Sequence, residues 1–512
     1  MIARLPSRCW NFDAAAHLLV RAGFGGTPAQ IETLVSQGMG AAVDSLLDSL
    51  PEDVQSPAWA VPTNLQDLQL QIRQTADSEE KRELQKRVRQ QANEELRNLV
   101  HWWILRMTQT RAPLVENMTL FWHGHFATSA EKVHQPYKMW LQNETFRAHA
   151  LGNFGALTKA VSRDPAMMIW LDLVQSQKNK PNENFARELM ELFTLGEGHY
   201  TENDVKESAR AFTGYRIDPL NQSFRFAANQ HDPAPKTFLQ KTGRWDGDQI
   251  INIILAQPAC ARFIVSKLWK YFAYDDPAPD LIEALASRFH TTNYELKPLL
   301  ETIFTSEEFY STKAMNSQIK SPIRLVVQGS RTIGLPVLEG QFLQTVFRQL
   351  GQAPFYPPNV KGWEGGKSWI NTATLTTRYE ITRQLVEGAN PGQLGLPKPA
   401  NSMLTLAGPP PQNGRSQFGL AQNLSSAAVP PENIPQRLTA PLDITPLVTE
   451  EDRQQPEKVV RKLFVLVFQT SPKPEVAHQF QLLASTKGVP LDDQAIRELV
   501  ALMMSTPHYQ LC

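Results

Sequence analysis

The chain has 512 residues, of which 42% are apolar and 20% are charged, a composition typical of a globular protein. Lys plus Arg and Asp plus Glu each number 51, so no net charge attracts nucleic acid or an anionic membrane. The three cysteines are too widely spaced for a metal or redox motif or a disulfide framework. No segment approaches ~18 consecutive apolar residues, so no membrane span is predicted.

The N-terminus carries Arg4 and Arg8 but no apolar segment of the secretory type before Asp13. The sequence therefore predicts a cytoplasmic protein by default. Export with a partner, or from a longer precursor, is the alternative.

Residues 1–388 are predicted to form one main body of packed helix pairs. Ala14 to Arg21 reads as a short amphipathic helix closed by glycines, and Thr27 is a natural cap for the next helix. From 64 to 110 the composition shifts to Gln, Glu, Lys and Arg with sparse leucines, which predicts a long charged helical arm. The apolar end of this arm, Leu99 to Met107, is expected to enter the core.

The centre of the chain, residues 182–216, is predicted to be two helices separated by a glycine turn. Asn184, Glu188 and Glu191 follow one another at i, i+4 and i+7, so they share one face of the first helix. Thr201, with an acid three residues later, predicts a capping box for the second helix.

The remaining segments differ in character. Ser223 to Phe226 and Lys236 to Leu239 alternate well enough to predict a small β-hairpin. Residues 389–449 hold 11 of the 37 prolines and few charges, which predicts a disordered insert or linker. Residues 450–512 are predicted to form helices that dock on the main body. The fold class is therefore mainly α, with a minor β-hairpin.

Two histidine-containing motifs are candidates for metal binding. His123 and His125 are two residues apart, so they point to different sides of an ideal helix unless Gly124 interrupts it. Otherwise one of them is a hydrogen-bonded core residue and the other is exposed. His231 and Asp232 adjoin in a loop, where they can be ligands, a base with its orienting acid, or only a turn.

The acidic face of the central helix is the candidate catalytic site. Glu188 and Glu191 can bind a cation or act as an acid/base pair. The alternative is that Arg187 and Arg210 neutralise these glutamates in a structural network of ion pairs.

A tryptophan-rich segment near residue 360 is the last candidate site. Trp363 and Trp369 lie between glycines and can stack on a sugar, or can fill the helical core as an ordered loop. The GGKS sequence beside them does not form a phosphate loop, since Lys361 occupies the position of the first glycine of that motif.

Several long stretches resemble, in order, the motifs of the bacterial family called domain of unknown function 1800. They are RAGFG at Arg21–Gly25, FWHGHF at Phe121–Phe126, ENFARELMELFTLG at Glu183–Gly196, YTENDVKESARAFTG at Tyr200–Gly214, and FYPPNVKGWEGGKSWIN at Phe355–Asn371. The resemblance implies a helical fold and no settled activity. It also implies that many relatives carry export signals and that their genes often neighbour those of a sulfatase-like family, which makes such a protein a candidate partner.

Three hypotheses for function follow. The first is a metal-assisted hydrolase acting on a surface polymer or glycan, with a divalent metal ion as cofactor. Its pocket would collect His123, His125 and His231 as metal ligands and Glu188, Glu191 and Asp232 as catalytic groups. The second is a non-enzymatic helical scaffold that binds a partner protein. The third is a carbohydrate-binding module that uses the two tryptophans.

Overall fold

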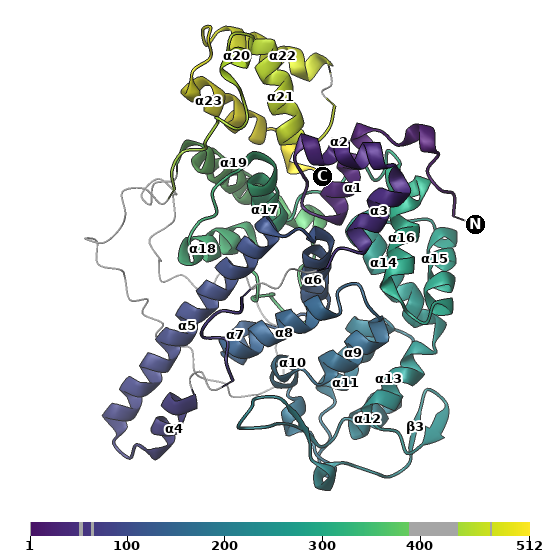
Figure 1. Ribbon diagram of the computed structural model, residues 1–512. Coiled ribbons are helices and arrows are strands. Elements are labelled where there is room, and N and C mark those ends of the chain that lie inside the picture. The colour runs from purple at the N-terminus through teal and green to yellow at the C-terminus, as the bar shows by residue number, and fades with distance from the viewer. Residues whose placement is uncertain (1, 51–54, 63–65, 389–438, 472–473) are drawn as a thin grey trace.

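The computed structural model describes residues 2–50, 55–62, 66–388, 439–471 and 474–512 (Figure 1). Helices dominate these residues, and the predicted mainly α fold class is confirmed. Most of the predicted insert, residues 389–438, lies outside the described residues.

Buried apolar side chains form two cores. The first is built from side chains between Leu5 and Ala314, and the second combines residues 96–139 with residues between Ile323 and Tyr509. Helix α6 (Pro113–His125) supplies side chains to both cores, and within it only Gly124 is not fully buried. The helix that carries two candidate histidines therefore lies between the two cores.

The N-terminal helices begin where the sequence predicts. Helix α1 (Phe12–Ala22) is followed by α2 (Pro28–Gln37) and α3 (Met39–Leu47). The side chain of Thr27 accepts a hydrogen bond from the Gln30 N–H, and the Gln30 side chain accepts one from the Thr27 N–H, which forms a capping box.

The predicted charged arm consists of α4 (Gln66–Gln74) and α5 (Ser78–Gln109). Figure 1 shows the start of α5 extending from the body together with α4. The C-terminal end of α5 enters the second core, where Trp103 and Met107 are fully buried. There α5 packs against α17 (Pro322–Ile333) and α18 (Gly340–Leu350).

Further helices complete the first core. They are α8 (Pro136–Ala148), α9 (Phe154–Ser162), α10 (Pro165–Trp170), α13 (Gly247–Leu255), α14 (Pro258–Phe272), α15 (Pro279–Thr291) and α16 (Leu296–Thr305). The short helix α7 (Ala130–Val133) places its buried side chains in the second core. Helices α8, α9, α13 and α14 follow one another in contact, so the chain keeps returning to the same core.

The central helix pair contains an element that its sequence did not predict. Helix α11 (Asn184–Glu188) continues as a π-helix, η3 (Leu189–Thr194), before the turn that leads to α12 (Glu202–Ala211). Within η3 and just after it, Leu195 N–H donates to the Met190 carbonyl at 2.8 Å, five residues back. Such π-turns interrupt α-helices and occur frequently at functional sites.

The predicted β-hairpin is wrong in its pairing. Strand β2 (Phe224–Phe226) pairs with β1 (Tyr215–Ile217), and β3 (Lys236–Phe238) pairs with β4 (Lys241–Gly243). The described residues thus contain two separate hairpins. Each strand pairs with its nearest neighbour in sequence, which requires a shorter loop than the predicted pairing.

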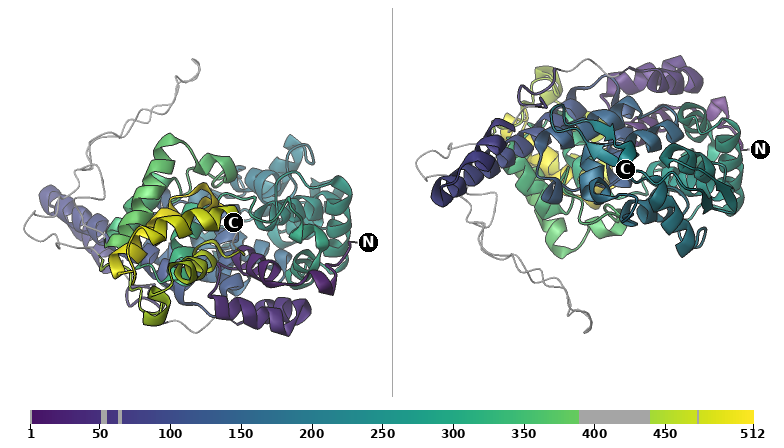
Figure 2. Two further views of the ribbon diagram at one scale, coloured as in Figure 1. Left: turned by 90° about the horizontal axis from the view of Figure 1, so that it is seen from above. Right: turned by 90° about the horizontal axis from the view of Figure 1, so that it is seen from below.

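The C-terminal residues pack on α19 (Thr372–Glu387) and on α17. They form α20 (Glu450–Arg453), α21 (Pro456–Phe468), α22 (Pro474–Ser485) and α23 (Asp493–Met504), which share the second core with α5 and α18. The left view in Figure 2 shows the yellow C-terminal segment beside the green helices.

One part of the predicted disordered insert is ordered. Residues 439–449 are described, and Leu442, Ile444 and Val448 are buried in the second core. Leu442 N–H donates a 2.9 Å hydrogen bond to the Val386 carbonyl at the end of α19. These three apolar side chains are too few to be noticed in a proline-rich composition.

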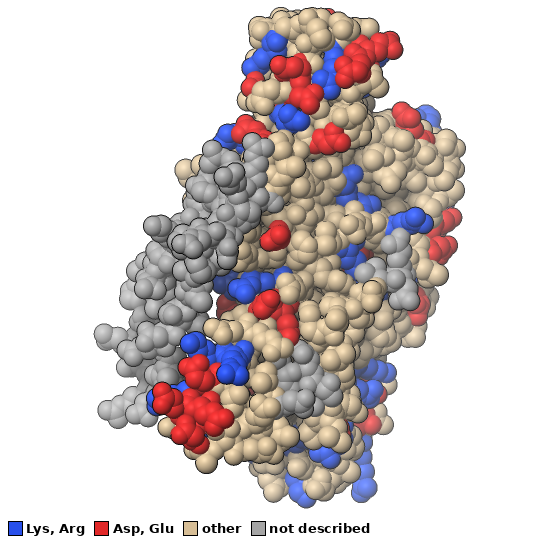
Figure 3. Space-filling view, turned by 60° about the vertical axis from the view of Figure 1, so that its left-hand side comes forward, with Lys and Arg blue, Asp and Glu red and all other residues tan. Residues whose placement is uncertain are grey.

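No single helix among the described residues is long and apolar enough to cross a membrane. The bent pair formed by α13 and α14 passes that test together, and its apolar side chains lie in the first core. On the face shown in Figure 3, basic and acidic side chains are interspersed.

Candidate functional site

His123 holds a loop of the second core against α6. Its side chain is 1% exposed, and its Nε2 accepts a 2.9 Å hydrogen bond from the Phe355 N–H. The rings of Trp103 and Phe355 lie 5.3 and 5.1 Å from the imidazole. Burial in these apolar surroundings lowers the pKa of His123 to about 3. The side chain is therefore a neutral core imidazole whose Nε2 lone pair is already used.

His125 faces the opposite core and binds the π-helix. It is 6% exposed, and its Nε2 donates to the Phe193 carbonyl at 3.0 Å. Lys267 of α14 lies 3.4 Å from its Nδ1 and donates to the Leu192 carbonyl at 3.0 Å. Burial, followed by the Lys267 charge, keeps the pKa of His125 well below its ordinary value.

The side chains of His125 and Lys267 together donate hydrogen bonds to carbonyl groups of η3. A π-turn shifts the hydrogen bonds of the backbone, so carbonyls at its end need other donors. Lys267 and His125 supply these donors from two different helices. Burial lowers the pKa of Lys267 to about 8.

The predicted alternative of one buried and one exposed histidine is wrong, since His123 and His125 are both buried.

Glu188, the last residue of α11, and Glu191 of the π-helix are both half-buried. The Tyr200 hydroxyl donates a 2.8 Å hydrogen bond to Glu191 Oε2. The Glu188 carboxylate makes no hydrogen bond or ion pair within the described part of the chain. Burial and the adjacent Glu191 raise the pKa of Glu188, although Lys361 and Arg187 act in the opposite direction. We refer to Glu188, Glu191, Tyr200 and Lys361 as the glutamate face.

The arginines of the central helices do not neutralise the two glutamates as the alternative prediction required. Arg187 binds Glu202 of α12 at 2.6 Å and lies 3.6 Å from Glu183. Arg210 binds two other carboxylates, Glu207 of α12 and Asp232 of the loop between β2 and β3. Neither arginine therefore forms an ion pair with Glu188 or Glu191.

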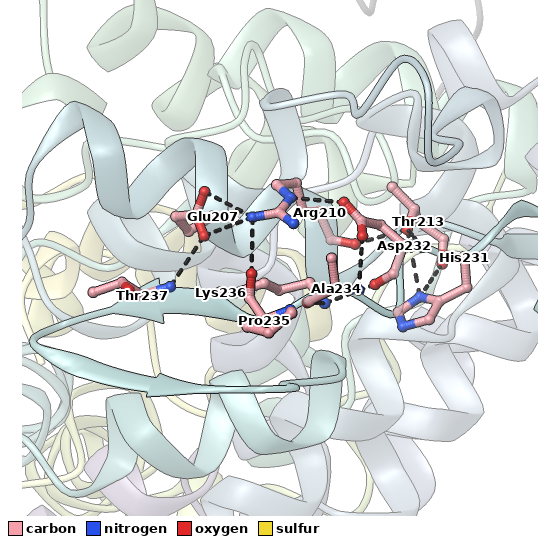
Figure 4. Close-up of polar contacts among 9 residues, drawn as sticks. All are labelled: Glu207, Arg210, Thr213, His231, Asp232, Ala234, Pro235, Lys236 and Thr237. Carbon is pink, nitrogen blue, oxygen red and sulfur yellow. Dashed lines mark hydrogen bonds and ion pairs between the residues drawn. The ribbon is translucent and has the colours of Figure 1, made fainter.

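Asp232 belongs to the network around Arg210, shown in Figure 4. Arg210 donates to Asp232 at 2.7 Å and to Glu207 at 2.8 Å. Glu207 also accepts a 3.0 Å hydrogen bond from the Thr237 N–H at the start of β3. Although burial opposes it, the hydrogen bond from Arg210 lowers the pKa of Asp232. This carboxylate is already bound by an arginine.

The loop that carries Asp232 is fixed from both sides. His231 Nδ1 donates to the Thr213 carbonyl at 3.0 Å, and Lys236, which is 1% exposed, donates to the carbonyls of Asp232 and Ala234. Gly214, the residue after Thr213, has a φ of +83°, and a Cβ there would lie 2.7 Å from the Ala227 carbonyl oxygen. The whole group therefore acts as a structural connection between α12 and the two hairpins.

The six predicted site residues are consequently not collected in one pocket. His123 faces Phe355, His125 faces Phe193, and His231 and Asp232 lie at α12. No group of three or more His, Cys, Asp or Glu side chains within the described ranges is placed to hold a metal ion. The geometry does not support the predicted metal site. His123 Nε2, His125 Nε2 and His231 Nδ1 each form a hydrogen bond with a backbone group instead.

The tryptophan segment covers the end of α6. Trp369 is 6% exposed, and the ring of Trp363 lies 5.7 Å from that of His123. Gly362 has φ +79°, and a Cβ at this position would lie 2.3 Å from the Gly124 carbonyl oxygen. This packing is the arrangement expected of an ordered loop that fills the core, and it also brings Lys361 beside Glu188.

Sequence reasoning did not identify Tyr200, Lys267 or Lys361 as site residues. Tyr200 lies in the motif Tyr200–Gly214, and Lys361 lies in the motif Phe355–Asn371. Their place in these motifs is the only signal in the sequence that could have identified them. Lys267 has none, because its role depends on the packing of α14 against η3.

Comparison with known proteins identifies the family. Residues 17–511 match the family described as "Protein of unknown function (DUF1800)", so the chain belongs to that family. No curated protein and no solved structure matches the chain.

Proposed function

We propose that this protein is a non-enzymatic helical scaffold that binds a partner protein through the glutamate face. The observation that carries the proposal is the Glu188 carboxylate, which is half-buried yet makes no hydrogen bond within the described residues. His123, His125 and Asp232, by contrast, are already bound by internal partners.

A carboxylate in this position favours binding of a donor from outside. The Glu188 oxygens are not among the buried side-chain atoms without a partner, so water can reach them. A donor from another chain can replace that water. Lys361 adds an exposed positive charge to the same face. A partner that presents a basic side chain opposite Glu188 and an acidic one opposite Lys361 is complementary to it, and such complementarity fixes orientation.

The candidate partner is the sulfatase-like protein that the family resemblance implies. The test mixes the two purified proteins and measures the affinity of the complex by titration calorimetry. Glu188→Lys reverses the charge at the centre of the face and is expected to weaken binding by about tenfold or more, as a lost interfacial charge pair does.

Glu475→Lys is the matched control, since Glu475 is an exposed glutamate on α22. It should leave the affinity unchanged. Equal binding by the wild type and Glu188→Lys would show that the glutamate face is not the interface.

A hydrolase acting on a surface polymer or glycan is the second candidate, and one observation favours it. Burial and the charge of the adjacent Glu191 raise the pKa of Glu188, and a carboxyl group with a raised pKa can act as a general acid. In this candidate the glutamates act without histidine ligands. Release of reducing sugar from a panel of surface glycans, lost in both Glu188→Gln and Glu191→Gln, would favour the hydrolase over the scaffold.

A further inference from the structure

A second surface, distant in sequence from the glutamate face, has the form of a binding groove. It has a volume of about 1020 Å³ and lies between the N-terminal segment, the start of α15 and residues 307–315. Ligand sites commonly enclose roughly 300–1,000 Å³, so the space is large enough for several side chains. The N-terminal segment forms one wall because Leu5 N–H donates to the Thr305 carbonyl and Glu307 N–H donates to the Ala3 carbonyl.

Part of the wall of this groove is apolar. Ile2, Leu281 and Met315 line it and are half-buried, whereas Leu5, Ala14 and Tyr310 are already buried by the protein itself. Burial by a ligand of the surface that the half-buried side chains still expose is favourable, at about 25 cal/mol for each Å². The groove therefore has a region that an apolar side chain can cover.

The rim of the groove is acidic. Asp280 in the first turn of α15 and Glu307 are exposed, and neither carboxylate makes an ion pair or hydrogen bond in the described part of the chain. Glu308 accepts a hydrogen bond from Tyr274, and Asp13 accepts one from the Ser471 N–H at 2.7 Å. Lys313 is the one basic side chain among the described lining residues. The groove thus carries an excess of negative charge in a protein of zero net charge.

We propose that this groove binds an extended peptide segment of a partner in which lysine or arginine stands beside an apolar residue. The basic side chains pair with Asp280 and Glu307, and the apolar side chain lies against Ile2 and Leu281. The long aliphatic stems of lysine and arginine add contact with the apolar wall. A small inorganic cation would use the acidic rim but not this wall.

The experiment measures the fluorescence anisotropy of a labelled peptide of sequence Lys-Leu-Lys-Leu-Lys titrated with the full-length protein. A Glu-Leu-Glu-Leu-Glu peptide is the anionic control. The cationic peptide is expected to bind and to weaken as salt is raised, because the pairs on the rim are exposed. The double variant Asp280→Asn/Glu307→Gln should bind it about tenfold more weakly, as the loss of two exposed ion pairs allows.

Two further variants make the result specific to the groove. Glu79→Gln/Glu80→Gln removes two exposed acids from the first turn of α5 and should bind the peptide like the wild type. Ala284→Arg places a long cation on an exposed helical position that lines the groove and should abolish binding without disturbing the core. Circular dichroism checks that each variant is folded.

Three results would overturn the proposal. They are equal binding of the two peptides, undiminished binding by Asp280→Asn/Glu307→Gln or Ala284→Arg, and displacement of the peptide by spermine at the peptide's own concentration. The last result would assign the rim to small polycations and leave the apolar wall without a role.

Discussion

His125 Nε2 donates a 3.0 Å hydrogen bond to the carbonyl of Phe193, and this contact joins helix α6 to the π-helix beside the glutamate face. A histidine in one of the most recognisable motifs of the chain thus supports the backbone that presents Glu188 and Glu191. Lys267 completes the support from α14. The motif histidines act on the candidate site through packing and not as ligands.

Removal of Lys267 should loosen the π-helix. In Lys267→Met the aliphatic stem is retained but the Leu192 carbonyl loses its donor, which costs about 1–3 kcal/mol for an unsatisfied buried group. Hydrogen exchange measured by mass spectrometry should increase in residues 189–196 relative to the wild type. Lys270→Met on the exposed side of the same helix is the control and should leave exchange in that segment unchanged. Unaltered exchange in Lys267→Met would contradict the supporting role.

The buried Glu116 should be among the most sensitive positions for stability. Its carboxylate lies 2.7 Å from Arg106 and 2.6 Å from Arg147, and it also accepts a hydrogen bond from Trp103. Burial acts against ionisation, but Arg147 and Arg106 outweigh it and lower the pKa of Glu116. Glu116→Gln removes the buried anion that both guanidinium groups share, while Arg147 keeps its ion pair with Glu144. The loss should cost about 3 kcal/mol in denaturant unfolding, as the breaking of a buried ion pair does.

Glu498 provides the matched comparison for that substitution. It pairs with Lys487 at 2.6 Å, but both side chains are about one-third exposed. Glu498→Gln should cost no more than about 1 kcal/mol, the usual contribution of a surface pair. If the two variants unfold at the same denaturant concentration, the Glu116 network is not a principal stabilising element.

Asp164 should make stability depend on pH in the neutral range. Burial raises the pKa of its carboxyl to about 7, although hydrogen bonds from Met167 and Gln142 and the charge of Lys138 act in the opposite direction. Because the folded pKa lies above the unfolded value, the folded state holds the proton more tightly. The stabilising contribution is fully present below pH ~4 and is lost as the pH rises through 7.

The variant Asp164→Asn isolates this effect, since asparagine can still cap α10. The free energy of unfolding of the wild type, measured relative to that of the variant, should decrease as the pH rises from 5 to 8. The decrease should be up to about 1.4 kcal/mol for each unit of the pKa shift. A difference that is constant over this range would show that Asp164 is ionised throughout.

Gly362 should be irreplaceable because of its contact as well as its conformation. Its φ is +79°, and a Cβ would lie 2.3 Å from the Gly124 carbonyl oxygen. Gly351 has a similar φ of +87° but no atom within 4 Å of the Cβ position. Gly351→Ala should therefore cost only the strain of positive φ, about 1–2 kcal/mol, whereas Gly362→Ala should cost more and displace Lys361. Equal melting temperatures would contradict the close approach of the loop to α6.

The sequence predicts the local structure better than the contacts between elements. Thr27 and Thr201 cap helices as predicted, since capping depends only on residues within one turn. The π-turn at 189–194 was missed because His125 and Lys267, which satisfy its carbonyls, are far away in the chain. The strands were found near their predicted positions but pair differently, because alternation reveals a strand and not its neighbour.

The candidate site shows the same division. Glu188 and Glu191 share a half-buried face as their spacing predicted, and the partial burial of that face raises the pKa of Glu188. The predicted gathering of His123, His125 and His231 required knowledge of how α6 and α12 pack. Each imidazole instead binds a backbone group of its own surroundings, at Phe355, Phe193 and Thr213, and no spacing in the sequence reveals these contacts.

The scaffold account also predicts the metal content of the purified protein. The described residues contain no group of three or more metal-ligating side chains, so elemental analysis should find less than one equivalent of any transition metal. His123→Ala/His125→Ala should not change that value, although it should lower the melting temperature through loss of two buried side chains. A stoichiometric metal that disappears in the double variant would restore the metal-centre hypothesis.

The most direct test of the central claim is calorimetric titration of the purified protein with the sulfatase-like candidate partner, in wild-type and Glu188→Lys forms. The account predicts a saturable one-to-one complex with the wild type, binding weaker by about tenfold or more in Glu188→Lys, and unchanged binding in Glu475→Lys. Absence of a complex with the wild type, or equal affinity in Glu188→Lys, would contradict the proposal that the glutamate face binds this partner.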